Sequence, residues 1–182
     1  MKVSYKINQS TLNAIRDDSL KWGTMFLIVR MLEMGNLADM DWIKESILVL
    51  IGFATYHLTF GTFLDTSGLS NKLAEVADIA LKFGTMIIVA HLLAGGKVNN
   101  AKLTSVGYEL VGYSLGAAFL NDLAQLNNFQ GRSKKLMSDV LFFGGHAFFL
   151  QVMQGNNITD PGFLRDLTLL LMGFSTYTVF VQ

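Results

Sequence analysis

One unit occurs three times along the chain, and this internal repeat limits the possible folds more than any other feature. The segment Asp18-Ser-Leu-Lys-Trp-Gly-Thr-Met returns as Asp78-Ile-Ala-Leu-Lys-Phe-Gly-Thr-Met and, more faintly, as Asp139-Val-Leu-Phe-Phe-Gly-Gly-His. Each copy continues with a polar stretch that begins with glycine, and then with a glycine followed by an aromatic residue. The landmark glycines keep a period of 60 to 61 residues and are Gly23, Gly84, Gly144, Gly52, Gly112 and Gly173. Landmarks in register over three copies indicate a triplicated unit.

Each unit consists of an apolar run, a polar Gly/Asn turn and a second apolar run, which is the pattern of a helical hairpin. Runs of 13 to 19 residues are too long for typical strands of about 5 to 6 residues. We therefore predict an all-α fold of three two-helix hairpins, over residues 18–65, 78–122 and 139–182. A polar, interfacial segment precedes them and two linkers join them: 1–17, 66–77 and the basic linker 123–138. Helix N-termini are expected at Asp18, Asp78 and Asp139, because carboxylates there accept backbone N–H bonds.

The composition favours a membrane protein. Hydrophobic residues make up 51% of the chain and charged residues 15%, against about 25% charged residues in average soluble domains. Only the run Ser46–Leu64 comfortably meets the length of about 20 apolar residues that a spanning helix needs, so a soluble helical protein remains the alternative. Glycines recur inside the apolar runs, where they weaken a soluble helix but let membrane helices pack closely. We predict a polytopic membrane bundle of about six helices, packed at Gly23, Gly52, Gly84, Gly112, Gly116, Gly144 and Gly173.

The basic residues are unevenly distributed along this predicted topology. If all six runs span the membrane, the N-terminus and the two linkers share one side with nine Lys and Arg residues, and the turns share the other side with four. The positive-inside rule then predicts that both termini lie on the positive, cytoplasm-equivalent side.

Several chemistries lack the residues that they need. Lys+Arg and Asp+Glu balance at 14 each, so the basic excess typical of nucleic-acid binding is missing and no nucleic-acid partner is predicted. The absence of cysteine excludes disulfides and thiolate metal sites, and the three histidines lie in unrelated contexts. We therefore predict no metal and no cofactor.

The stretch Gly112-Tyr-Ser-Leu-Gly116 matches the GxSxG nucleophile elbow of hydrolases, with Asp122 or Asp139 and then His146 in the expected chain order. The repeat argues against this function, because the same glycine-aromatic pattern recurs in two units that lack GxSxG. The elbow also requires a strand before the serine, whereas a helix is expected there. We therefore predict a helix-packing surface and no enzyme.

A polar residue follows the first glycine of each unit by seven positions: Arg30, His91 and Gln151. One hypothesis is a polar level that lines a solute or proton path between the repeats, because polar groups inside a membrane are costly. The favoured alternative is that Arg30 and His91 lie near helix ends and reach the interface. His57 and Glu109 are interpreted as hydrogen-bonding partners between helices, and a helix cap is expected at Asp39 and Asp41.

Two segments contain the pattern Gly-Phe-x-x-Tyr: Arg165-Asp-Leu-Thr-Leu-Leu-Leu-Met-Gly-Phe-Ser-Thr-Tyr177 and Gly52-Phe-Ala-Thr-Tyr-His57. Through these segments the chain resembles small multi-span membrane proteins of nucleocytoplasmic large DNA viruses. The resemblance covers the hairpins but not the first seventeen residues, and the second unit departs from it with Leu115 and Gly116 in place of threonine and tyrosine. The resemblance implies an inner-membrane or minor capsid protein of a virion, tethering the bilayer to the capsid shell.

The leading hypothesis is a structural membrane protein that organises a bilayer or anchors neighbouring membrane or capsid proteins, as a monomer or as a homo- or hetero-oligomer. The alternative is a small channel or transporter with a pore between the repeats, since internal repeats are common in transporters. A soluble helical interaction module ranks third.

Overall fold

The computed structural model describes residues 7–61, 70–116, 118 and 130–181. Every regular element in these residues is helical, which confirms the all-α prediction. The six helices are α1 (Gln9–Leu32), α2 (Met40–Thr59), α3 (Asn71–Leu93), α4 (Asn100–Leu115), α6 (Gly131–Met153) and α7 (Pro161–Phe180).

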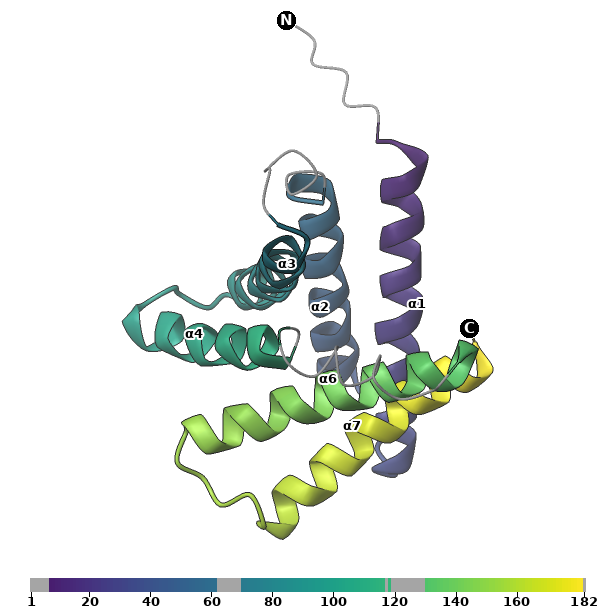
Figure 1. Ribbon diagram of the computed structural model, residues 1–182, viewed down its shortest axis with the longest axis vertical. Coiled ribbons are helices and arrows are strands. Elements are labelled where there is room, and N and C mark those ends of the chain that lie inside the picture. The colour runs from purple at the N-terminus through teal and green to yellow at the C-terminus, as the bar shows by residue number, and fades with distance from the viewer. Residues whose placement is uncertain (1–6, 62–69, 117, 119–129, 182) are drawn as a thin grey trace, which may run out of the picture.

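The helices form three hairpins arranged in a closed ring. The hairpins are α1–α2, α3–α4 and α6–α7, and they meet at three boundaries, α2 with α3, α4 with α6, and α7 with α1. Figure 1 shows that the hairpins run in different directions: α1 and α2 lie along the vertical, α3 is seen nearly end-on, and α6 runs across the view. The first and last helices therefore close the ring, although they are far apart in sequence.

Aromatic residues from all six helices fill the centre of the ring. Each hairpin stacks the aromatic residue before its first landmark glycine on the one after its second. The ring centroids are 4.9 Å apart for Trp22 and Phe53, 3.8 Å for Phe83 and Tyr113, and 3.7 Å for Phe143 and Phe174. Trp22 also meets Phe83 and Phe143 edge to face. The sequence repeat is thus a pseudo-threefold arrangement in space, with the aromatic core on its axis.

The first helix of each hairpin begins earlier than predicted. The residues that precede these helices are Asn8, Ser70 and Gln130, so the prediction of helix N-termini at Asp18, Asp78 and Asp139 is wrong. The three aspartates lie about two turns or more inside their helices, where their carboxylates bond to other side chains of the ring instead of capping a helix. The basic residues Arg132, Lys134 and Lys135 likewise belong to the first turns of α6 rather than to a linker.

The second helix of each hairpin begins at an equivalent polar cap. The side chains of Asp39, Asn99 and Asp160 each accept a hydrogen bond from a backbone N–H in the first turn of α2, α4 and α7. The expected cap at Asp39 is therefore confirmed. These caps fix where each hairpin turns back.

The three turns share one backbone geometry. The residue after the C-cap has a positive φ, 53° at Met34, 85° at Gly95 and 71° at Gly155. The N–H of the following residue donates to the carbonyl five residues earlier in the chain, as in a Schellman C-cap. Glycine is the residue expected at such a position, since a side chain there costs about 1–2 kcal/mol. Met34 is therefore strained where its two counterparts are not.

Two helices, α3 and α6, are long and apolar enough to cross a membrane. Only 17% and 11% of their most apolar stretches is buried within the described part of the chain. Helix α2 ends at Thr59, and the last residues of the predicted run Ser46–Leu64 lie outside the described residues. Two of the six helices thus have the length and composition that crossing a membrane requires, which is compatible with a membrane localisation.

Candidate functional site

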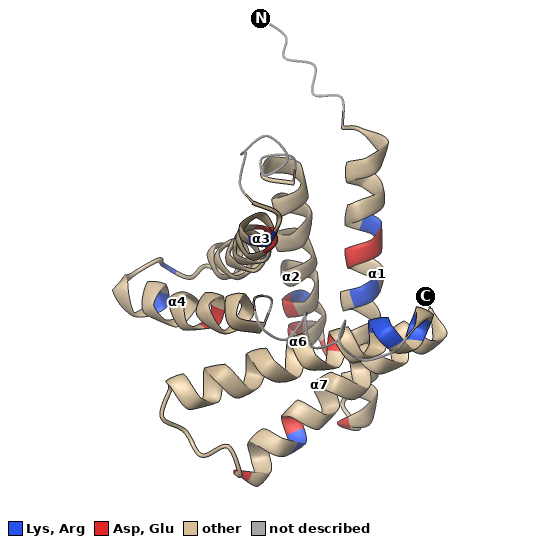
Figure 2. Ribbon diagram, in the orientation of Figure 1, with Lys and Arg blue, Asp and Glu red and all other residues tan. Residues whose placement is uncertain are grey.

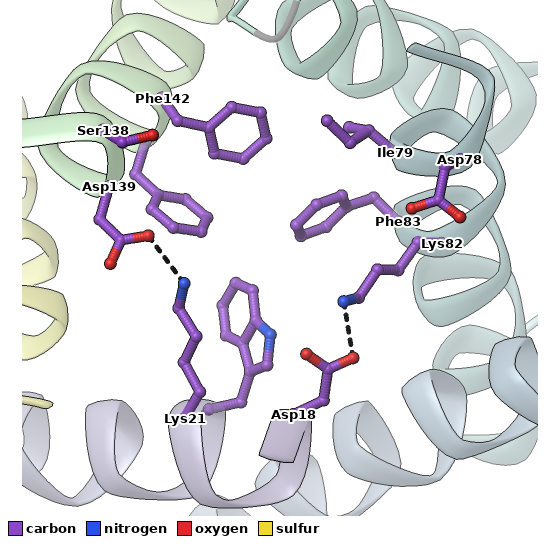
Figure 3. A pocket seen from close by; sticks show the side chains of 11 residues that line it. Asp18, Lys21, Asp78, Ile79, Lys82, Phe83, Ser138, Asp139 and Phe142 are labelled. Atoms are coloured by element: carbon purple, nitrogen blue, oxygen red, sulfur yellow. Dashed lines mark hydrogen bonds and ion pairs between the residues drawn. The ribbon is translucent and has the colours of Figure 1, made fainter. Parts of the chain in front are cut away.

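A hollow of about 220 Å³ opens on the pseudo-threefold axis, above the aromatic core. It is lined only by the first helices of the hairpins, α1, α3 and α6 (Figure 3). The lining positions lie one to six residues before the first landmark glycines, so the three repeats contribute equivalent residues. Charged side chains are concentrated here, which makes the hollow the candidate functional site.

Two carboxylates at equivalent positions are held in the same way. Lys82 Nζ lies 2.6 Å from the Asp18 carboxylate, and Lys21 Nζ lies 2.8 Å from that of Asp139. In both cases the lysine comes from the neighbouring hairpin. The charged groups are largely buried, since the side chains of Asp18 and Asp139 are 14% and 12% exposed. Ion pairs therefore join hairpin 1 to both of its neighbours.

The second helix of the same hairpin completes each carboxylate's contacts. His57 Nε2 lies 2.6 Å from Asp18, and Thr178 Oγ1 donates to Asp139 at 2.8 Å. His57 and Thr178 occupy equivalent positions, five residues after the second landmark glycine of their units. His57 thus acts as the interhelical hydrogen-bonding partner that the sequence analysis expected.

The lysines also lie over the aromatic core. Lys21 Nζ is 5.4 Å from the centroids of both Phe143 and Phe174, and Lys82 Nζ is 5.7 Å from that of Phe53. A cation over an aromatic face is attracted by the ring quadrupole. The aromatic rings also fill the axis below the hollow, so the described residues leave the hollow closed at its base.

The third hairpin boundary has apolar residues at the positions where the other two have ion pairs. Ile79 stands where the other units have Asp18 and Asp139, and Phe142 stands where they have lysine. Figure 3 shows these two side chains on one wall of the hollow and the two ion pairs on the other. Asp78 falls one residue out of register and accepts a hydrogen bond from Tyr56. The hollow therefore has a charged wall and an apolar wall.

A second layer, below the hollow, brings each second landmark glycine against the next hairpin. A Cβ at Gly52 would lie 2.6 Å from the Met86 backbone, one at Gly173 would lie 2.9 Å from the Met25 side chain, and one at Gly112 would lie 2.8 Å from His146 Nδ1. These glycines therefore allow the close approach that the three boundaries require.

The boundary between α4 and α6 carries a polar pair in this layer. His146 Nε2 lies 3.2 Å from the Glu109 carboxylate, and the imidazole stacks on Tyr113 with centroids 3.5 Å apart. His146 Nδ1 is buried and has no hydrogen-bond partner among the described residues. Glu109, expected to bond between helices, therefore does so across a hairpin boundary.

The other predicted packing glycines lie in looser surroundings. A Cβ at Gly84 or Gly144 would meet a leucine of its own hairpin at ordinary contact distance, 3.5 Å and 3.8 Å respectively. At Gly116 it would lie 3.1 Å from the Phe142 carbonyl, and at Gly23 nothing described lies within 4 Å. The tight approach is thus concentrated at the hairpin boundaries.

The structure does not bring Arg30, His91 and Gln151 together. A side-chain nitrogen of each lies within hydrogen-bond distance of the backbone carbonyl six residues later, in its own turn. The distances are 3.3 Å from Arg30 to Asn36, 3.1 Å from His91 to Lys97 and 3.2 Å from Gln151 to Asn157. Figure 1 shows the three turns well apart from one another. The shared spacing of these polar residues therefore has a local explanation, as supports of three equivalent turns.

Among the described residues, the GxSxG pattern is not part of an assembled catalytic triad. Ser114 lies within helix α4, Asp122 lies outside the described residues, and Asp139 and His146 make their polar contacts with other residues. No group of three or more His, Asp or Glu side chains in the described residues could hold a metal ion.

The ion pairs on the axis were not predicted from the sequence. An aspartate recurs three or four residues before a lysine in the first two units, but the paired residues lie on different hairpins, so this spacing does not identify the partners. No protein-family model matches the chain, and no curated protein or solved structure matches it.

Proposed function

We propose that this chain is a structural membrane protein, which organises a bilayer or anchors neighbouring proteins to it. The observation that carries the proposal is the distribution of charge and apolar surface. Ion pairs lie on the central axis, whereas large apolar side chains face outward on every helix, for example Leu103 at 50% and Phe148 at 43% exposure. Lipid solvates such an outer surface, and water does not.

The charge pattern along the helices fits the same proposal. Figure 2 shows long uncharged stretches, and α6 carries no charged residue from its middle to the α6–α7 turn. The ring closes without helices at its centre, so every helix keeps one face turned outward. A bilayer around this ring would cover the apolar faces.

The number of spans is part of the proposal. All six helices cross in one version, whereas only α3 and α6 cross in the other, as their length and hydropathy suggest. The versions differ in where they put Lys97, in the α3–α4 turn, and Gln130, before α6. Six spans put these two residues on opposite sides of the membrane, and two spans put them on the same side.

Because the chain has no cysteine, single-cysteine variants test this directly. Lys97→Cys and Gln130→Cys proteins in sealed vesicles are treated with a membrane-impermeant maleimide before and after detergent. Labelling of only one of the two before detergent supports six spans, and equal behaviour supports two. Recovery of the unmodified protein in the aqueous phase after a carbonate wash would overturn membrane residence altogether.

The virion setting follows from the viral resemblance and belongs to the same proposal. The expected partners are then the internal bilayer and capsid proteins of the particle. Immunogold labelling of thin-sectioned virus-infected cells tests it, with label expected on the membrane inside the particle. Label confined to host membranes would remove the capsid role and leave the membrane role intact.

A channel is the second candidate, because the charged hollow lies on the pseudo-threefold axis where a pore would run. The aromatic residues at its base argue against an open path. A liposome flux assay decides between the two. Ion flux that is lost in Lys21→Ala and Lys82→Ala variants would favour the channel, and no flux from the unmodified protein would exclude it.

A further inference from the structure

The first turn, defined as residues 33–39 between α1 and α2, has a methionine at the left-handed position where the other two turns have glycine. Met34 has a φ of 53°, whereas glycine occupies the same place in the other two turns. Its side chain is 94% exposed, so it does not contribute to the core. The left-handed backbone belongs to the turn itself, but the fold does not require methionine there, since glycine serves the other two turns without strain.

The first turn differs from the others in a second respect. Met31 and Met40 flank Met34, and they are 62% and 73% exposed. The positions equivalent to Met34 and Met40 are glycine and Asn100 in the second hairpin, and glycine and Pro161 in the third. Three exposed methionines therefore gather only at this corner of the pseudo-threefold molecule.

A tryptophan lies beside this methionine tip, defined as Met31, Met34 and Met40. The guanidinium of Arg30 lies 5.7 Å from the Trp42 ring centroid and pairs with Asp39 at 2.7 Å. Tryptophan is enriched at membrane interfaces, and arginine there extends its charge towards water. Unbranched methionine side chains adapt to irregular apolar surroundings.

We propose that the methionine tip inserts into the interfacial layer of a bilayer of zwitterionic lipids and fixes the orientation of the first hairpin. The inference rests on the proposed membrane residence and names the segment and the lipid class. Zwitterionic lipid is favoured because the first turn and its flanks carry Glu33, Asp39 and Asp41 against one arginine. An anionic surface repels this net negative charge.

The test uses Trp42 as its reporter. A Trp22→Phe protein retains Trp42 as its only tryptophan, and phenylalanine already occupies the two positions equivalent to Trp22. The protein is reconstituted into phosphatidylcholine vesicles with brominated acyl chains, and vesicle flotation measures membrane residence. We expect strong quenching of Trp42 by bromines near the headgroup and little quenching by aqueous iodide.

The decisive variant copies the second turn: Met34→Gly with Met40→Asn in the Trp22→Phe background. It relieves the backbone strain, so folding is preserved, and it should lower bromine quenching at least about twofold, since interfacial binding scales with buried apolar area. Val98→Ser, a polar change in the second turn, is the matched control and should leave the quenching unchanged. Adding phosphatidylserine should weaken the quenching in the parent protein.

The outcomes separate the two proposals. If the parent protein floats with the vesicles but iodide quenches Trp42 fully, the tip lies in water, free for a protein partner, and the lipid assignment is overturned while membrane residence stands. If the double variant is quenched as strongly as its parent, the methionines are not the anchor. If the parent protein does not float, membrane residence itself fails.

Discussion

The three hairpin boundaries have one backbone arrangement but two distributions of charge. At the α2–α3 and α7–α1 boundaries, an ion pair lies at the level of the hollow and methionine packs on glycine below it. At the α4–α6 boundary, Ile79 and Phe142 occupy the upper level, and the pair Glu109–His146 lies below. Each boundary thus keeps a pair of ionisable side chains in contact, but the level of that pair changes.

This comparison shows which features the ring requires and which it can exchange. The glycines of the lower layer occur at all three boundaries, because helices approach there closely whatever the neighbouring side chain is. The polar residues are exchangeable, because a buried ion pair and an apolar pair of similar volume often contribute similar stability. Loss of one member of a pair is different, since it leaves an uncompensated charge.

The largest effect is expected at the glycine boundaries. Gly52→Ala would place a Cβ 2.6 Å from the Met86 backbone, which cannot move aside, and should lower the free energy of unfolding by about 3 kcal/mol. Gly173→Ala meets the flexible Met25 side chain and should cost about 1 kcal/mol. Thermal unfolding in detergent, followed by circular dichroism, measures both. Equal losses would contradict the role of the rigid backbone contact.

The second-largest effect is expected when one substitution breaks the upper ion pair, and a second substitution that builds an apolar pair in its place should reverse it. Asp139→Ile leaves Lys21 buried without its carboxylate and should lower the free energy of unfolding by about 3 kcal/mol. Adding Lys21→Phe copies the Ile79–Phe142 pair of the third boundary and should restore most of that stability. Chemical unfolding of both variants in detergent checks the recovery, and a double variant as unstable as the single one would show that the boundaries are not interchangeable.

The reverse exchange at the lower layer should have a smaller effect. Glu109→Leu leaves His146 without its only recorded polar partner among the described residues and should cost about 1–2 kcal/mol. Glu109→Leu with His146→Met copies the α7–α1 boundary, where Leu170 and Met25 stand, and should match or exceed the parent stability. Tryptophan fluorescence on heating measures both. A double variant weaker than Glu109→Leu alone would refute the exchange.

The smallest effect is expected from substitutions at the left-handed position of the first and third turns. Met34→Gly should raise the free energy of unfolding by about 1 kcal/mol, because it removes the left-handed strain. Gly155→Ala introduces the same strain in the third turn and should lower stability by about the same amount. The two melting temperatures should therefore shift in opposite directions, and a loss in both variants would mean that Met34 has an internal role.

Much of the fold could be predicted from local sequence. The hairpins follow from apolar runs separated by Gly/Asn turns, and the cap at Asp39 follows from its position before α2. The helix starts were wrong because the carboxylates of Asp18 and Asp139 resemble caps in sequence, whereas in the structure they pair with lysines across hairpin boundaries. Partners that lie more than 60 residues away leave no local signal.

The sequence by itself determined that the unit is a helical hairpin and that it occurs three times, because residue periodicity and turn chemistry act over short distances. Only the tertiary structure decided that the three hairpins close into a ring, since α1 meets α7 through packing between distant segments. It also separated the roles of residues that share a spacing. Arg30, His91 and Gln151 support their own turns, whereas Lys21 and Lys82 pair across the hairpin boundaries, because the direction of each helix face is set by the packing of the whole ring.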